Sequence, residues 1–116
     1  MGLASNALNY MLDQLGAQIT YASLHTDAVG GGSASEVTGG TPPYARKAVT
    51  WAAAAAGSKA MNGTLPTWDV PAITVRRIGF FTALTSGTYY GDADITDEVF
   101  AAQGTYTLTA ASMTLT

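Results

Sequence analysis

Turn-forming residues interrupt this chain about every ten residues, which leaves room for only short segments of regular structure between them. The interruptions are glycine clusters, Asn-Gly and Ser-Gly pairs, and prolines. The intervening segments are rich in Thr, Tyr, Val and Ile, which favours strands. About seven or eight short strands at this spacing predict a mainly β chain, folded as an antiparallel β-sandwich or a small barrel. The length fits a single domain, residues 1–116.

One short amphipathic helix is predicted near the N-terminus, over residues 6–15. Its apolar residues recur at helical spacing and form one stripe: Leu8, Met11, Leu12 and Leu15. Ser5 or Asn6 can cap the start of this helix, and Gly16 fits the position just after its end. About ten residues are marginal for an isolated helix. The stripe therefore needs a partner surface, within the chain or on another subunit.

A glycine-rich loop is predicted after the first strand candidate, which covers residues 19–26. Two glycine clusters lie within a dozen residues and bracket the segment 35–38. Such clusters indicate a long, flexible, exposed loop over about residues 28–43. Long loops in compact domains are usually functional or disordered. Its part 30–40 is a candidate docking element.

The next strand candidate covers residues 44–51 and alternates its two faces. Tyr44 and Arg46 share one face of this strand because side chains two residues apart point the same way. Five alanines follow at 52–56. Alanine favours helix, but five residues cannot nucleate one alone, so we interpret this run as a closely packed continuation of the strand.

Three further segments precede the acidic part of the chain. The Asn-Gly pair at 62–63 is a strong hairpin signal. Two prolines make residues 65–70 suitable for an edge strand or an irregular connector. Residues 73–83 form the most apolar strand, and its alternation changes phase at the two arginines, 76–77. This change predicts a β-bulge or a strand buried on both faces.

An acidic loop is predicted over residues 91–98. Its carboxylates are Asp92, Asp94, Asp97 and Glu98. The first two fit the start of a calcium-binding loop, but the EF-hand pattern breaks after them, so a solvated loop is the favoured interpretation. A glycan hydrolase using Asp92, Asp94 or Glu98 would need two carboxylates about 5–10 Å apart in a cleft. No motif supports that alternative.

The C-terminal part of the chain has no charged side chain from residue 100 to residue 116. Residues 105–110 and 113–116 alternate as strands, yet soluble monomers usually protect strand edges with charge, proline or cover. Either the edge closes within the fold, or a neighbouring subunit covers it. Ala, Thr and Gly fill 51 of 116 positions and only 11% of residues are charged, which favours the second alternative.

Composition excludes several classes of protein. Five Lys and Arg against eight Asp and Glu give a net charge of −3, so no nucleic-acid partner is expected. The basic pairs at 46–47 and 76–77 are candidates to pair with the acidic loop or with a neighbour. With no Cys and one His we expect no cofactor and no metal site. No run of about 18 apolar residues and no signal peptide are present, so we expect no membrane contact and synthesis in the cytoplasm.

The single histidine, His25, is weighed as a catalytic residue because Ser23 and Asp27 lie beside it. A Ser-His-carboxylate triad needs the three groups to converge. Ser23 and His25 instead share one face of a strand, and no G-x-S-x-G motif is present. A hydrogen-bonded structural histidine is the favoured interpretation, and no catalytic residue is assigned.

Eight Tyr and Trp side chains are candidates for a sugar-binding face: Tyr10, Tyr21, Tyr44, Tyr89, Tyr90, Tyr106, Trp51 and Trp68. Aromatic residues in this number are more often core and interface anchors. A carbohydrate- or receptor-binding module would expose Trp68, Tyr89 and Tyr90 on one loop face.

Several stretches, taken in order, resemble a family of small virion proteins of tailed bacteriophages. They are Tyr21–Thr26, Ser35–Val37, Gly39–Trp51, Trp68–Ala72, Ile78–Phe81 and Gly87–Gly91. The Tyr-Ala-Arg-Lys-Ala-Val-Thr-Trp stretch is the most specific, and the resemblance runs from about residue 3 to residue 110. Such proteins are often labelled tail-fibre or minor tail proteins of actinobacterial phages. The resemblance leaves two positions open for this chain, on the tail or on the capsid as a decoration (cement) protein.

The resemblance implies a non-enzymatic structural protein on the virion exterior. Its expected partners are major capsid or tail proteins, with further copies of the chain in a homo-oligomer. The alternative is a host-surface binding module at the tail tip. Candidate subunit-interface residues are Leu8, Met11, Leu12, Leu15, Tyr44, Trp51, Phe81, Tyr106 and Leu108.

Overall fold

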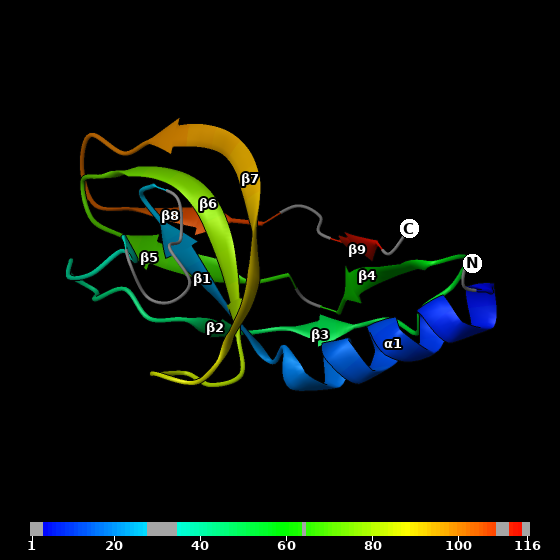
Figure 1. Cartoon of the computed structure of the whole chain (residues 1–116). Helices are drawn as coiled ribbons and strands as arrows, with labels where there is room; N and C mark the ends of the chain where they lie inside the picture. The colour runs from blue at the N-terminus through cyan, green and yellow to red at the C-terminus, as the bar shows by residue number, and fades with distance from the viewer. Residues whose placement is uncertain (1–3, 28–34, 64, 109–111, 115–116) are drawn as a thin grey trace.

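A computed structural model describes residues 4–27, 35–63, 65–108 and 112–114. These residues form one helix and nine short strands, which lie in an elongated arrangement (Figure 1). The elements are α1 (Ser5–Gln18), β1 (Tyr21–His25), β2 (Lys47–Ala48), β3 (Thr50–Trp51), β4 (Ser58–Asn62), β5 (Thr67–Val70), β6 (Thr74–Phe81), β7 (Tyr89–Val99), β8 (Gly104–Thr107) and β9 (Ser112–Thr114). The mainly β fold with an N-terminal helix is confirmed.

All strand pairings of the described residues are antiparallel. They form a four-stranded sheet of order β2-β1-β6-β7, a three-stranded sheet of order β3-β4-β9 and the pair β5-β8. In Figure 1, α1 lies alongside β3 and β4 at one end of the molecule, and the long β6-β7 hairpin arches over β1 at the other. Short strands in several small sheets agree with the frequent turn signals.

The core lies between the four-stranded sheet and the β5-β8 pair. Trp68 of β5 is completely buried, and its Nε1 donates a hydrogen bond to the carbonyl of Ala22 in β1, at 3.2 Å. Its ring packs against Tyr106 of β8, with ring centroids 6.0 Å apart. Because a buried Trp N–H needs an acceptor, this bond fixes how β5 sits on β1.

Helix α1 is longer than the predicted 6–15 and differs at both ends. Ala4 occupies its N-cap position without a side-chain hydrogen bond, so neither Ser5 nor Asn6 is the cap. Gly16 does not end the helix but lies buried within it. The helix packs so closely on β4 that a Cβ at Gly16 would overlap the Lys59 side chain. The partner surface that the helix needs is therefore provided, at least in part, by this chain.

The alanine run 52–56 is not a strand, contrary to the sequence interpretation. Ala52 continues the pairing with one hydrogen bond to Ala60, but the backbone then leaves the sheet and turns at Ala56, where φ is +52°. The amide of Ala54 donates instead to the Asp13 carboxylate of α1, at 2.9 Å. A helix side chain thus replaces the missing strand partner.

Two other expectations about connections are wrong. Residues 91–98 are not a loop but most of β7, because β6 provides a partner strand and two arginines opposite the carboxylates. Asn62-Gly63 turns the chain without forming a hairpin, since β4 pairs with β3 and β9 while β5 pairs with β8. The hairpin signal is local, and the pairing is decided by distant segments.

The two arginines of β6 lie at the predicted β-bulge. The register shifts between Val75 and Arg77. These two residues are two positions apart in β6, but their partners in β7, Glu98 and Asp94, are four positions apart. Beyond the bulge, Ile78 to Phe81 are all buried, so both faces of this part of β6 are covered. Residues 65–70 also behave as predicted, since β5 belongs to a two-stranded pair and is an edge strand.

Candidate functional site

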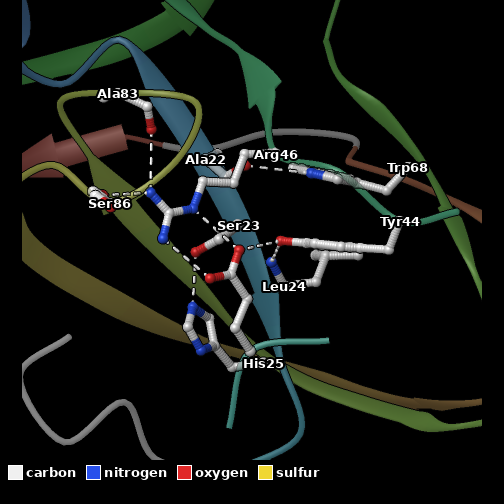
Figure 2. Close-up of polar contacts among 10 residues, drawn as sticks. Ala22, Ser23, Leu24, His25, Tyr44, Arg46, Trp68, Ala83 and Ser86 are labelled. Carbon is white, nitrogen blue, oxygen red and sulfur yellow. Dashed lines mark hydrogen bonds and ion pairs between the residues drawn. The ribbon is translucent and has the colours of Figure 1, made fainter. Parts of the chain in front are cut away.

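A buried polar cluster lies beside β1 and joins segments that are far apart in the sequence (Figure 2). We define the buried cluster as Tyr44, Glu36 and Arg46. Arg46 donates from Nε to Glu36 Oε2 and from Nη2 to Oε1, both at 3.0 Å. Tyr44 donates to the same Oε2 at 2.8 Å and accepts a hydrogen bond from the Leu24 amide at 3.0 Å. The carboxylate is thus fully engaged in a two-pronged ion pair.

The remaining donors of Arg46 hold the connection between β6 and β7. Its Nη1 donates to the carbonyl oxygens of Ala83, at 3.1 Å, and Ser86, at 2.7 Å. The guanidinium also stacks over the Phe81 ring, with Cζ 3.7 Å from the ring centroid. One side chain therefore ties Glu36, in the described part of the predicted glycine-rich loop, and the β6-β7 turn to the sheet, which makes the buried cluster a structural fastening. Residues 28–34 of that loop lie outside the described residues.

The buried cluster presents little to solvent. The Arg46 and Glu36 side chains are 5% and 14% exposed. Burial raises the pKa of Tyr44 far above its usual value, so its phenol stays protonated and donates to Glu36. A cleft of about 460 Å³ opens beside the cluster, between Thr38 and Gly39 on one side and Leu84 and Thr85 on the other.

Ser23 and His25 share a face of β1, as predicted, and form a hydrogen bond of 2.6 Å between Oγ and Nε2. Both residues are completely buried. Gly79 of β6 lies opposite Ser23, and a Cβ there would approach both side chains at 2.6 Å. The pair fills the space that this glycine leaves, and it offers no access to a substrate.

Two of the four acidic residues of β7, Asp92 and Asp97, form ion pairs with the arginines of β6. We define the edge cluster as Tyr89, Asp92 and Arg77. Arg77 donates to Asp92 Oδ2 at 3.1 Å, and Tyr89 donates to Oδ1 at 2.7 Å. Arg76 and Asp97 form a second, exposed pair at 3.4 Å. Arginines 76 and 77 thus pair with the acidic segment, whereas Arg46 binds Glu36.

No metal centre emerges from these carboxylates. Within residues 4–27, 35–63, 65–108 and 112–114, no three His, Cys, Asp or Glu side chains are grouped so as to hold a metal ion. Asp92 and Asp97 are instead committed to arginines.

The predicted interface residues divide between core and surface. Leu12, Phe81 and Leu108 are buried within the chain and have almost no surface to offer a partner. Four others are partly buried against the core: Leu15, Tyr44, Trp51 and Tyr106. Of this set only Met11, at 39% exposure, is among the exposed large apolar side chains of the described residues, and its neighbour Tyr10 is 66% exposed.

The aromatic residues do not form the predicted sugar-binding face. Trp68 is buried in the core, and Tyr89 uses its hydroxyl to bind Asp92. Tyr90 is 44% exposed. The three residues that a host-surface module would present together therefore do not form one exposed face.

Two functional side chains were missed by sequence reasoning. Glu36 is the one acidic residue in the glycine-rich segment, and Tyr44 and Arg46 were predicted on one face of a strand over residues 44–51, which was a weak signal of their convergence. In the structure both residues precede β2, and the predicted strand is replaced by two short strands, β2 and β3, in different sheets. Lys59 had none. It is buried, and its Nζ donates to Asp13 at 2.6 Å and to the Ala52 carbonyl at 2.8 Å.

A second cleft, of about 540 Å³, separates β7 from β8. We call it the seam. It is lined by Asp94, Ile95, Thr96, Glu98, Phe100, Thr105, Tyr106, Thr107 and Leu108. Unlike the cleft beside the buried cluster, it lies between strands of two different sheets.

A small β-rich chain whose polar clusters fasten its own segments together has the character of a structural protein. Residues 3–116 match the family described as Podophage GP4 fiber I protein gp80, and the chain belongs to this family. It is a phage fibre-type protein and hence a virion component, in agreement with the resemblance found in the sequence. A search of curated proteins gave no match. No helix of the described residues has the length and apolar character needed to span a bilayer.

Proposed function

We propose that the protein is a non-enzymatic structural subunit on the virion exterior, of the tail-fibre or minor tail type, that docks on other virion proteins. The observation that carries the proposal is the free edge of β8. Its four residues, Gly104–Thr107, carry no charge, and their only strand partner among the described residues is β5. An uncharged free edge is a template for pairing with another chain.

Exposed apolar side chains on α1 support the same proposal. Tyr10 and Met11 face solvent while Leu12 is buried, so the helix retains apolar surface on the side that does not pack on β4. Aromatic and Met side chains are enriched at protein interfaces. A homo-oligomer is part of this proposal, and the exposed Tyr10 and Met11 side chains of α1 are available for contact with a further copy.

The test compares virions with and without this protein by negative-stain electron microscopy. Particles that lack the gene product should lose a feature on the tail exterior, and a purified labelled copy should bind these particles and restore it. Label on the head instead would favour a capsid-decoration role. Unchanged particles that bind no labelled copy would contradict the proposal.

A host-surface binding module is the weaker candidate, because Trp68 is buried and Tyr89 is occupied by Asp92. Binding of the purified protein to a glycan array or to host cells, with no binding to virion proteins, would favour it instead.

A further inference from the structure

The seam runs along the edges of two strands rather than across their faces. Four consecutive residues of the β8 segment line it, 105–108, as do three consecutive residues of β7, 94–96. Side chains of a strand alternate between two faces, so a cleft on one face would be lined by every second residue. Consecutive lining residues place the backbone edge itself at the seam.

Both strand edges are unpaired on the side of the seam. β7 is the last strand of its sheet and pairs with β6, and β8 pairs with β5. No strand pairing joins β7 to β8 within the described residues. Four residues of a strand span about 13 Å. The seam thus offers a backbone edge long enough to pair with a short extended segment.

The seam has an apolar floor and an acidic rim. Ile95, Phe100 and Tyr106 are partly buried against the core and form the floor. Asp94 and Glu98 line the rim, and both are exposed. No ion pair involves either carboxylate in the described part of the chain, whereas Asp92 and Asp97 are each paired with an arginine. The rim therefore carries two available negative charges.

Electrostatics within the seam agree with this arrangement. Burial raises the pKa of Tyr106, and the negative charge of Glu98 raises it further. The Glu98 carboxylate is thus near the Tyr106 phenol, and both residues line the seam. A cation placed between them would meet a carboxylate and an aromatic ring, which is a favourable environment for Lys or Arg.

We propose that the seam binds an extended, Lys- or Arg-bearing segment of a neighbouring virion protein, which adds to the free edge of β8 as an extra strand. The inference rests on the proposed function, because it names the surface through which docking occurs and the chemistry of the partner. Main-chain hydrogen bonds along β8 would supply affinity, and the acidic rim would supply selectivity.

The acidic rim also argues against a second copy of this chain as the occupant. Charges and bulges on an edge strand discourage pairing with an ordinary strand, and β7 has both. Four of the five Lys and Arg residues of the chain are already in ion pairs: Arg46, Lys59, Arg76 and Arg77. A copy of this chain therefore has few cations to offer, whereas a basic segment of another protein meets the rim favourably.

Site-specific labelling tests the proposal on whole virions, because the chain has no native cysteine. Thr96→Cys and Thr105→Cys place a thiol in the seam, and Thr38→Cys and Ala53→Cys are exposed controls elsewhere. Each thiol is reacted with a maleimide in the free protein and in the assembled particle. The seam thiols should react about tenfold more slowly in the particle, as expected for a surface occupied about nine-tenths of the time.

The pattern of protection separates the inference from the proposed function. Control thiols that become protected while both seam thiols stay reactive would overturn the seam and leave docking intact. Four thiols that react equally in both states would contradict docking itself. A thiol-to-amine cross-link from the seam should identify a Lys-bearing extended segment of another virion protein, and a cross-link to a second copy of this chain would overturn the choice of partner.

Removal of the two negative charges of the acidic rim is the second test of the proposal. An exposed ion pair changes affinity by up to about fivefold. The double variant Asp94→Asn, Glu98→Gln should therefore bind particles that lack the protein between about twofold and 25-fold more weakly. Asp97→Asn is the matched control, since it removes one charge from the same strand outside the seam and should bind like the unmodified protein. Equal binding by all three proteins would overturn the role of the rim.

Discussion

The molecule contains the same chemical arrangement twice, in two different environments. In each, a tyrosine and an arginine bind one carboxylate. The buried cluster consists of Tyr44, Glu36 and Arg46, and the edge cluster consists of Tyr89, Asp92 and Arg77. The arginine of the buried cluster is 5% exposed and that of the edge cluster is 33% exposed. Phe81 contacts both clusters, through Arg46 on one side and Tyr89 on the other.

The difference between the clusters shows that geometry alone does not set the value of an ion pair. Around Arg46, removal of one partner would leave a charge without water or a counter-ion, and such a charge is costly to bury. Around Arg77, solvent can replace a lost partner, so the pair contributes little to stability. The buried cluster also joins four segments of the chain, which contain Leu24, Glu36, Tyr44 with Arg46, and Ala83 with Ser86. The edge cluster links only the neighbouring strands β6 and β7.

The largest expected effect is the loss of the buried arginine. Arg46→Met should lower the free energy of unfolding by about 3–5 kcal/mol, because Glu36 is then left buried without its cation. Chemical denaturation followed by tryptophan fluorescence measures this change. If the variant does not fold at all, Glu36→Gln with Arg46→Met should recover part of the stability by removing the stranded charge.

The matched substitution at the edge sharpens the comparison. Arg77→Met removes the same group from the same kind of cluster, and we expect a loss below about 1 kcal/mol. Equal losses for the two variants would show that burial does not distinguish the clusters.

Removal of a tyrosine hydroxyl should also lower the free energy of unfolding more in the buried cluster than in the edge cluster, with smaller losses than those of the arginine variants. Tyr44→Phe leaves the Leu24 amide and one oxygen of Glu36 each short of a hydrogen bond, and should cost about 1–3 kcal/mol. Tyr89→Phe removes one hydrogen bond near solvent and should cost less than about 1 kcal/mol. Thermal unfolding of both variants measures the difference. A larger loss for Tyr89→Phe would contradict the order.

The sequence predicted the local features of the fold better than its pairings. Three predicted features that depend on neighbouring residues were found: the alternation of Tyr106 and Leu108 with Thr105 and Thr107, the bulge at the arginines of β6 and the edge character of β5. Residues 109–111, at the end of the predicted C-terminal strand, lie outside the described residues. The strand at 91–98 was missed because four acidic residues lower its intrinsic preference for a strand. Its partner, β6, supplies the arginines that offset this cost, and local sequence does not reveal which strand will lie opposite.

The candidate site was less predictable for the same reason. Tyr44 and Arg46 were expected on one strand face, but their shared partner Glu36 lies across a glycine-rich segment whose path has no periodic pattern. Lys59 lies in a short polar stretch and is buried only because α1 covers it and provides Asp13. The seam is an arrangement of two edges, and its lining residues become neighbours only after both sheets have formed.

The smallest expected effect is a difference in alkaline stability. Burial, together with the hydrogen bond to Asp92, raises the pKa of Tyr89 to about 12 from its usual value of 10.0. The folded protein therefore favours the neutral phenol more than the unfolded chain does. The stability that the neutral Tyr89 phenol gives to the folded state is fully present below pH 10, and it is lost as the pH rises from 10 through 12.

Denaturation at a series of pH values from 8 to 12 measures this loss in the wild type and in Tyr89→Phe. The wild type should lose more stability than the variant over this range, because the variant has no phenol at this position to ionise. Tyr44 keeps its phenol in both proteins, so the stability that its ionisation removes at high pH is the same in both. This loss cancels when the stability of the variant is subtracted from that of the wild type. Parallel curves for the two proteins would mean that the Tyr89 phenol is as freely solvated in the folded state as in the unfolded chain. The Tyr89 hydroxyl would then contribute nothing to the edge cluster, which would depend on the pair of Arg77 and Asp92 alone.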